Sequence, residues 1–178
     1  MNAKNPLVNR LLRFVELLSA AGGVLSGVTF TLMTLLILAE IFMRTFFGQS
    51  TLNASEYSGY TLAAMIYLGL GFSFRQGAHI RITFLRERLK GWALHLLEIT
   101  CALAGSVLCV LSTVFMWEMV FTSYQRGATA YTVSETPLWI PQSIVLVGLI
   151  ILTMQVLAYL LFLIARGPGA VESRTVNI

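Results

Sequence analysis

Four stretches of the chain contain no charged residue and are long enough to cross a membrane as helices. Each is bounded on both sides by a charged residue, and together they cover residues 17–39, 57–74, 99–117 and 136–165. A transmembrane helix needs about 20 apolar residues to cross about 30 Å of hydrocarbon. Pro137 and Pro141 mark the entry into the last helix, because proline fits a first helical turn but not a helix interior.

This pattern predicts an all-α membrane protein with four transmembrane helices in one domain, residues 1–178. We expect the helices at about residues 14–44, 56–76, 93–122 and 140–165. A cleaved signal peptide is the alternative interpretation of the first apolar stretch. That stretch is too long for one, and no compact cleavage site of small residues follows it, so we expect an uncleaved first helix.

Composition supports a membrane protein. Hydrophobic residues make up 57% of the chain and charged residues only 11%, whereas a soluble domain usually carries roughly 25% charged residues. The net charge of +4 does not indicate nucleic-acid binding, because the cations lie at the ends of apolar stretches and not on a polar face with aromatic neighbours.

The distribution of Lys and Arg predicts the orientation in the membrane. The N-terminal tail, the segment after the second helix and the C-terminal tail hold ten of the 12 cations, whereas the other two connections hold one each, Arg44 and Arg126. Regions rich in Lys and Arg face the cytoplasm. We therefore expect both termini on the cytoplasmic side of the membrane.

The segment between the second and third helices mixes cations with apolar side chains. Leucine and tryptophan recur there at helical spacing, at Leu85, Leu89, Trp92 and Leu96. This spacing predicts an amphipathic helix on the cytoplasmic membrane surface over about residues 78–92. Its cationic face suits anionic lipid, and its apolar residues suit either lipid or a protein partner, so both functions stay open.

Small residues recur on the first two helices at spacings that let helix backbones approach closely. They are Ser19, Gly23 and Gly27 on the first helix, and Gly59, Ala63, Gly69 and Gly71 on the second. Packing within the four-helix unit is the favoured interpretation, and a contact between subunits is the alternative.

Ionisable residues are absent from the central parts of all four apolar stretches. A proton or ion relay needs such groups well inside the membrane, so the pattern does not favour one. Glu40 and Arg44 are spaced for an ion pair on one helix face, and Glu98 lies where water or head groups can solvate it. Two His residues, His79 and His95, make a poor zinc or haem site. No catalytic motif is present, and we expect no enzyme.

Two further patterns resemble a known family. After Glu56 opens the second helix, Arg75, Gly77, His79, Ile80 and Arg81 form an Arg-x-Gly-x-His-Ile-Arg pattern at its far end. The entry into the last helix, residues 137–141, is similar to the same family. Together with length and helix count, these residues resemble the small membrane subunit of tripartite ATP-independent periplasmic (TRAP) transporters, the DctQ type.

The resemblance implies a scaffold subunit in a sodium-driven importer of an organic acid. Its partners would be a large membrane subunit of the DctM type, a periplasmic substrate-binding protein of the DctP type, and membrane lipids. We expect Arg75, His79 and Arg81, with Glu56, at the partner or lipid interface, and Trp92 and Trp139 setting membrane depth. We expect no cofactor and no nucleic acid, and leave a bound phospholipid open.

Other functions remain alternatives. A self-sufficient four-helix transporter would need a carboxylate in the membrane, and Glu40 is the nearest candidate. A cofactor-bearing membrane anchor of a redox complex would need ligands that face one another from two spanning helices. A membrane enzyme would need a site that the sequence does not reveal.

Overall fold

The computed structural model describes residues 6–50, 53–76, 92–132 and 134–166. Within these ranges the chain forms four helices, α1 (Pro6–Phe47), α2 (Ala54–Arg75), α4 (Trp92–Gln125) and α5 (Trp139–Arg166). The same ranges contain no β-strand, and an isolated β-bridge joins Thr129 to Pro137 between α4 and α5. The prediction of an all-helical fold is confirmed.

Helix boundaries differ from the predicted ones mainly at α1. This helix begins at Pro6, about two turns before the expected start, because helical structure continues into the polar N-terminal flank. α5 begins at Trp139, which places Pro141 in its first turn as expected. The predicted interfacial helix at 78–92 lies outside the described residues, except for Trp92, which begins α4.

Three of the described helices are apolar and long enough to cross a membrane: α1, α4 and α5. At 1.5 Å per residue, their 42, 34 and 28 residues correspond to about 63, 51 and 42 Å. α2 is not among the three, because several Ser, Thr and Gly residues dilute its apolar sequence. Its 22 residues nevertheless correspond to about 33 Å.

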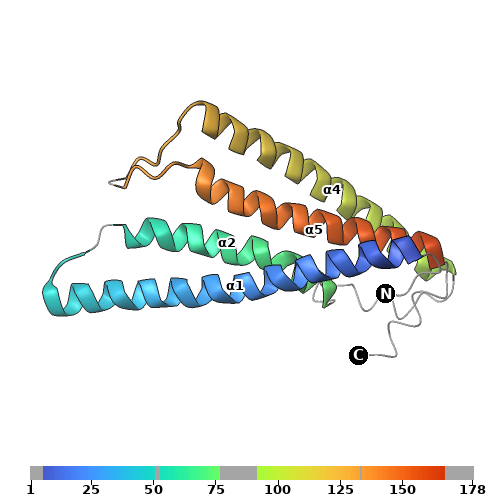
Figure 1. Cartoon of the computed structure of the whole chain (residues 1–178), viewed down its shortest axis with the longest axis horizontal. Coiled ribbons are helices and arrows are strands. Elements are labelled where there is room, and N and C mark those ends of the chain that lie inside the picture. Colours follow the sequence, from blue (N-terminus) through green and yellow to red (C-terminus); the bar gives the residue numbers. More distant parts are fainter. Residues whose placement is uncertain (1–5, 51–52, 77–91, 133, 167–178) are drawn as a thin grey trace.

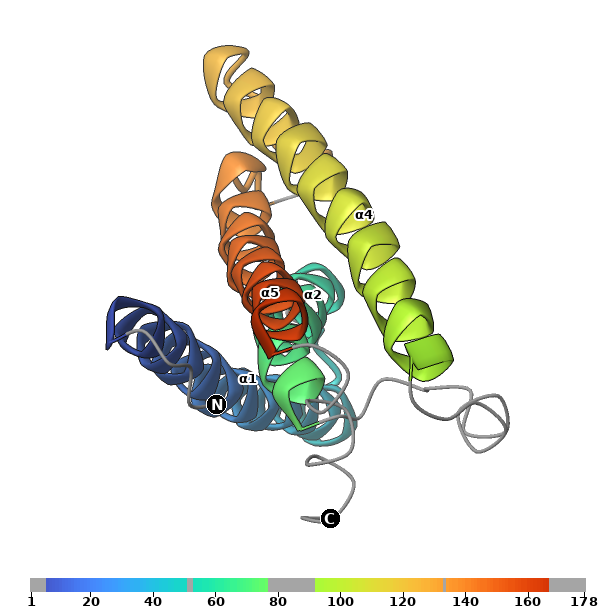
Figure 2. The same cartoon turned by 90° about the vertical axis from the view of Figure 1, so that its right-hand side faces the viewer.

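The helices form two antiparallel pairs, α1 with α2 and α4 with α5 (Figure 1). The pairs converge at the end of the bundle where α1 begins and α5 ends, which we call the terminal end. They diverge toward the opposite end, the loop end, where the α1–α2 and α4–α5 connections lie. Figure 2 shows α5 between α4 and the α1–α2 pair, and α5 is in contact with all three other helices. α5 is therefore the centre of the fold.

Buried core residues are concentrated on α5, from Val145 to Leu163, and two clusters lie toward the terminal end. Leu163 is 1% exposed and packs in a cluster with Tyr159 and with Ala102 of α4. A second cluster joins Ala158 to Leu12 and Val15 of α1. The packed core thus joins three helices where the two pairs converge.

Small residues bring the helix backbones together at several of the predicted positions. A Cβ atom at Gly23 would lie 2.7 Å from the Phe72 ring, and one at Gly71 would lie 2.9 Å from Ile151. Gly27 and Gly59, by contrast, have no atom within 4 Å of such a Cβ. Packing within the chain therefore explains some of the small residues on the first two helices, and it does not explain Gly27 or Gly59.

The closest approach involves a glycine that the sequence analysis did not single out. A Cβ at Gly148 of α5 would lie 2.5 Å from the backbone carbonyl of Tyr67 on α2. Such a distance is far below an ordinary van der Waals contact, so only glycine permits α2 and α5 to pack this closely.

Candidate functional site

Arg75 ends α2 and joins it to α1 at the terminal end of the bundle. Its Nη1 donates a hydrogen bond of 3.1 Å to the backbone carbonyl oxygen of Glu16. A cation in the last helical turn also interacts favourably with the helix dipole. Arg75 therefore fixes the end of α2 against α1. His79 and Arg81, predicted to act with it, lie outside the described residues.

A carboxylate and a tyrosine connect α4 to α5 at the same end. The hydroxyl of Tyr159, a buried side chain, donates a hydrogen bond to Oε2 of Glu98. The sequence analysis left Glu98 to water or lipid head groups, whereas the structure gives it a partner inside the bundle. His95, one turn earlier on α4, is 7% exposed, and its Nδ1 has no hydrogen-bond partner within the described part of the chain.

Glu56 lies in the first turn of α2 at the loop end, and its carboxylate accepts hydrogen bonds from three hydroxyl groups. Ser134 donates at 2.6 Å and Tyr60 at 2.8 Å, and Thr132 also donates. Ser134 and Thr132 belong to the α4–α5 connection, so Glu56 links that connection to α2. These hydrogen bonds, with Ser134 the largest contribution and Thr132 the next, lower the pKa of Glu56 from 4.5 to about 2.

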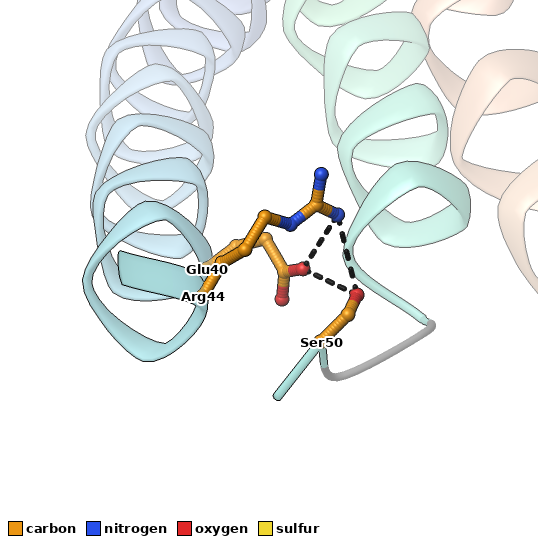
Figure 3. Close-up of polar contacts among 3 residues, drawn as sticks. All are labelled: Glu40, Arg44 and Ser50. Atoms are coloured by element: carbon orange, nitrogen blue, oxygen red, sulfur yellow. Dashed lines mark hydrogen bonds and ion pairs between the residues drawn. The ribbon is translucent and has the colours of Figure 1, made fainter. Parts of the chain in front are cut away.

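Glu40 and Arg44 form the ion pair that their spacing predicts. Arg44 Nη2 lies 3.1 Å from Glu40 Oε1, and the Ser50 hydroxyl donates to the same carboxylate oxygen at 2.6 Å (Figure 3). The pair lies near the loop end of α1, away from the middle of the membrane span. This position does not suit the midplane carboxylate that a self-sufficient transporter would need.

The middle of the bundle contains uncharged polar groups. The hydroxyls of Thr113 on α4 and Thr153 on α5 lie 2.9 Å apart. Gln155 of α5 is 3% exposed, and Ser19 of α1, which lies closer to the terminal end, is fully buried. Sequence reasoning missed Thr113, Thr153 and Gln155 because it searched the apolar stretches for ionisable groups. The interruption of the apolar α5 sequence by Thr153 and Gln155 is the signal that identifies them.

The two tryptophans of the predicted interface lie at opposite ends. Trp92 begins α4 at the terminal end and is largely exposed. Trp139 begins α5 at the loop end, where its ring lies 5.7 Å from that of Tyr124 in an edge-to-face arrangement. Tryptophan side chains are enriched at both membrane–water interfaces, and a place at each end of the bundle agrees with that preference.

Comparison with known proteins adds the identity of the family. The family model described as the DctQ component of tripartite ATP-independent periplasmic transporters matches residues 33–166, well over half of the chain. This chain belongs to the DctQ family. Neither a curated protein nor a solved structure matches it.

DctQ membership confirms the resemblance carried by Glu56 and the Arg75 pattern. The match includes all of α2, α4 and α5 and the part of α1 nearest the loop end. As a member of this family, the chain is the small membrane component of a TRAP transporter and works within a complex of several components.

Large apolar side chains are exposed along the whole of α1 and α4 in this DctQ chain. On α1 they include Leu25, Leu32, Leu35, Leu38 and Phe42; on α4 they include Leu103, Leu108, Leu111, Phe115 and Phe121. Large exposed apolar patches on a protein surface indicate contact with a membrane or with another protein.

Proposed function

We propose that this chain is the fixed scaffold subunit of a sodium-driven TRAP transporter that imports an organic acid. In this proposal a periplasmic binding protein of the DctP type delivers the acid. A large membrane subunit of the DctM type carries the sodium and substrate sites. The small subunit holds the large one in the membrane and carries no solute itself.

The observation that carries the proposal is the distribution of charge along the described helices. Within the described residues, charged side chains lie toward the two ends of the bundle, while the polar groups of its middle are uncharged and include hydroxyls, the Gln155 amide and the Cys109 thiol. Coupling to an ion gradient generally requires ionisable groups or broken helices near the middle of the membrane. The described helices are continuous through their middle sections, as a scaffold requires.

We further propose that all four helices cross the inner membrane, with both termini in the cytoplasm. α2 runs antiparallel to α1, since Ser26 contacts Met65 while Glu16 contacts Arg75. It therefore returns through the same layer that α1 crosses. The prediction from Lys and Arg then places the terminal end in the cytoplasm and the loop end in the periplasm.

The exposed faces of α1 and α4 are the proposed contacts with the large subunit and with lipid. Cysteine cross-linking tests this in cells that carry all three components, using a chain in which Cys101 and Cys109 are serine. We expect cysteines at Leu35 of α1 or Leu111 of α4 to cross-link to the large subunit, and a cysteine at buried Leu163 not to do so. Absence of cross-links from every exposed position on both helices would contradict the scaffold function.

Removal of the chain gives the functional test. In cells that retain the large subunit and the binding protein, we expect loss of sodium-dependent uptake of the acid that co-purifies with the binding protein. Re-expression of the chain should restore uptake. Undiminished uptake without the chain would show that the transporter does not need this subunit.

A further inference from the structure

A cleft opens between α1 and α2 at the loop end of the bundle. Its volume is about 310 Å³, and it is lined by Ile37, Glu40, Ile41, Arg44 and Thr45 of α1, and by Ser50, Ala54, Ser55 and Ser58 on or next to α2. Isoleucine side chains contribute an apolar part, and hydroxyl and charged groups contribute a polar part. A ligand for this cleft must therefore combine an apolar and a charged portion.

The two charges of the cleft differ in their exposure. The side chain of Glu40 is 13% exposed, whereas that of Arg44 is 69% exposed. Both hydrogen bonds of Arg44 within the described residues come from Nη2, one to Glu40 and one of 3.3 Å to Ser50. Figure 3 shows these contacts between α1 and Ser50, which follows α1 in the connection toward α2. A guanidinium has five N–H donors, so Nε and Nη1 can still donate to an anionic group.

The depth of the cleft in the membrane can be read from α1. Glu16 and Glu40 bound the charge-free part of this helix, and 24 residues at 1.5 Å each separate them by about 36 Å. The hydrocarbon layer is about 30 Å thick, and the polar head groups extend the bilayer to about 40–45 Å. Glu40 and Arg44 therefore lie at the level of the lipid head groups, with Ile37 one turn deeper.

We propose that this cleft binds the head group of a phosphatidylethanolamine, a zwitterionic phospholipid with a primary ammonium. The lipid phosphate accepts hydrogen bonds from Nε and Nη1 of Arg44. The ammonium lies against the Glu40 carboxylate, which can accept bonds at several lone pairs. The start of an acyl chain packs on Ile37 and Ile41. This inference stands independently of the proposed transport function.

The charge balance of the cleft favours this lipid over an anionic one. Glu40 and Arg44 together are neutral, so a ligand with a phosphate alone would leave the carboxylate facing a second negative charge. Phosphatidylglycerol is such a ligand. Phosphatidylcholine keeps both charges but has no N–H group to donate to Glu40. The expected order of binding is phosphatidylethanolamine, then phosphatidylcholine, then phosphatidylglycerol.

Native mass spectrometry of the delipidated full-length chain tests the proposal, with the three lipids added separately and with identical acyl chains. We expect about tenfold more bound phosphatidylethanolamine than phosphatidylglycerol, the ratio expected from one charge-assisted hydrogen bond. Arg44→Ala should reduce phosphatidylethanolamine binding about tenfold. Arg126→Ala, which removes another exposed cation near the loop end, is the matched control and should leave binding unchanged.

A second variant keeps the proposal testable if Arg44→Ala does not fold. Ser58→Leu places a bulky side chain in the cleft and keeps the Glu40–Arg44 pair, and it should also displace the lipid. Equal binding of the three lipids, or unchanged binding in both cleft variants, would overturn the proposal. Competition by inorganic phosphate alone at millimolar concentration would also overturn it, because the cleft would then be a simple anion site.

Discussion

α5 and α1 are both apolar enough to cross a membrane, yet they have opposite surroundings. In its most apolar 18-residue window, α5 has 44% of its residues buried, whereas α1 has none. α5 carries Gly148, Thr153 and Gln155 at positions that face other helices, while α1 carries exposed leucines and phenylalanines beyond Gly23. The comparison teaches that high hydropathy indicates that a helix lies in a membrane. Small and uncharged polar residues indicate which of its positions contact other helices.

Truncation of a leucine on each helix should give the largest difference in unfolding free energy between α5 and α1. Leu163→Ala on α5 removes a side chain that is 1% exposed and leaves a cavity, at an expected cost of about 2–5 kcal/mol in unfolding free energy. Leu38→Ala on α1, where the side chain is 56% exposed, should cost much less, because lipid or detergent fills the space. Denaturant unfolding in detergent micelles measures both. Equal losses would mean that α1 is as tightly packed as α5.

Addition of a single methyl group to a glycine of each helix should give the next largest difference in stability. Gly148→Ala places a Cβ 2.5 Å from the Tyr67 backbone and should cost about 1–3 kcal/mol through overpacking. Gly27→Ala on α1, with no atom within 4 Å, is the control and should not destabilise the chain. Thermal unfolding followed by tryptophan fluorescence distinguishes them. A stable Gly148→Ala variant would refute the close contact between α2 and α5.

Hydroxyl removal tests the polar middle of the bundle with a smaller effect. Thr153→Val breaks the contact with Thr113 and should cost about 0.6 kcal/mol, the average for such interhelical bonds. Thr31→Val removes only a bond to a carbonyl of its own helix and should be almost neutral. The double-mutant cycle of Thr113→Val with Thr153→Val isolates the interhelical interaction. A coupling energy of zero would mean that the two hydroxyls do not interact, and would leave the 3.3 Å hydrogen bond from Thr153 to the Cys109 carbonyl as its contact with α4.

The smallest expected effect is that of pH on the Glu56 contacts. The pKa of Glu56 is lowered from 4.5 to about 2, so its hydrogen bonds stabilise the fold fully above pH 4.5. This contribution is lost only as the pH falls through about 2. Trp139 fluorescence in a chain without the other two tryptophans should therefore stay constant from pH 4.5 to 9. A transition in that range that disappears in Glu56→Gln would contradict the lowered pKa.

Sequence patterns predicted the number of described helices and most of their boundaries, since charge-free stretches and proline positions are local signals. The Glu40–Arg44 pair was equally predictable, because residues four apart share one helix face. α2 was the exception among the predicted spans. Its Ser and Gly content lowers its hydropathy, and its packing along α1 is what supports our proposal that it crosses the same layer.

Long-range contacts could not be predicted from the sequence. Nothing local to Glu56 indicates that two of its three hydroxyl donors, Thr132 and Ser134, lie more than 70 residues away. The hydrogen bond from the Arg75 guanidinium to the α1 backbone was likewise not predicted, and the expected place of Arg75 at a partner or lipid interface stays a prediction. Which helix occupies the centre also depends on how the two pairs converge, and hydropathy alone does not report that.

Transport by reconstituted vesicles tests the scaffold function most directly. Vesicles containing this chain alone, the large subunit alone, or both are given a sodium gradient and the loaded periplasmic binding protein. We predict uptake of the organic acid only when both membrane subunits are present. Sodium-driven uptake by vesicles that contain this chain alone would contradict the scaffold function and assign the transport path to its own helices.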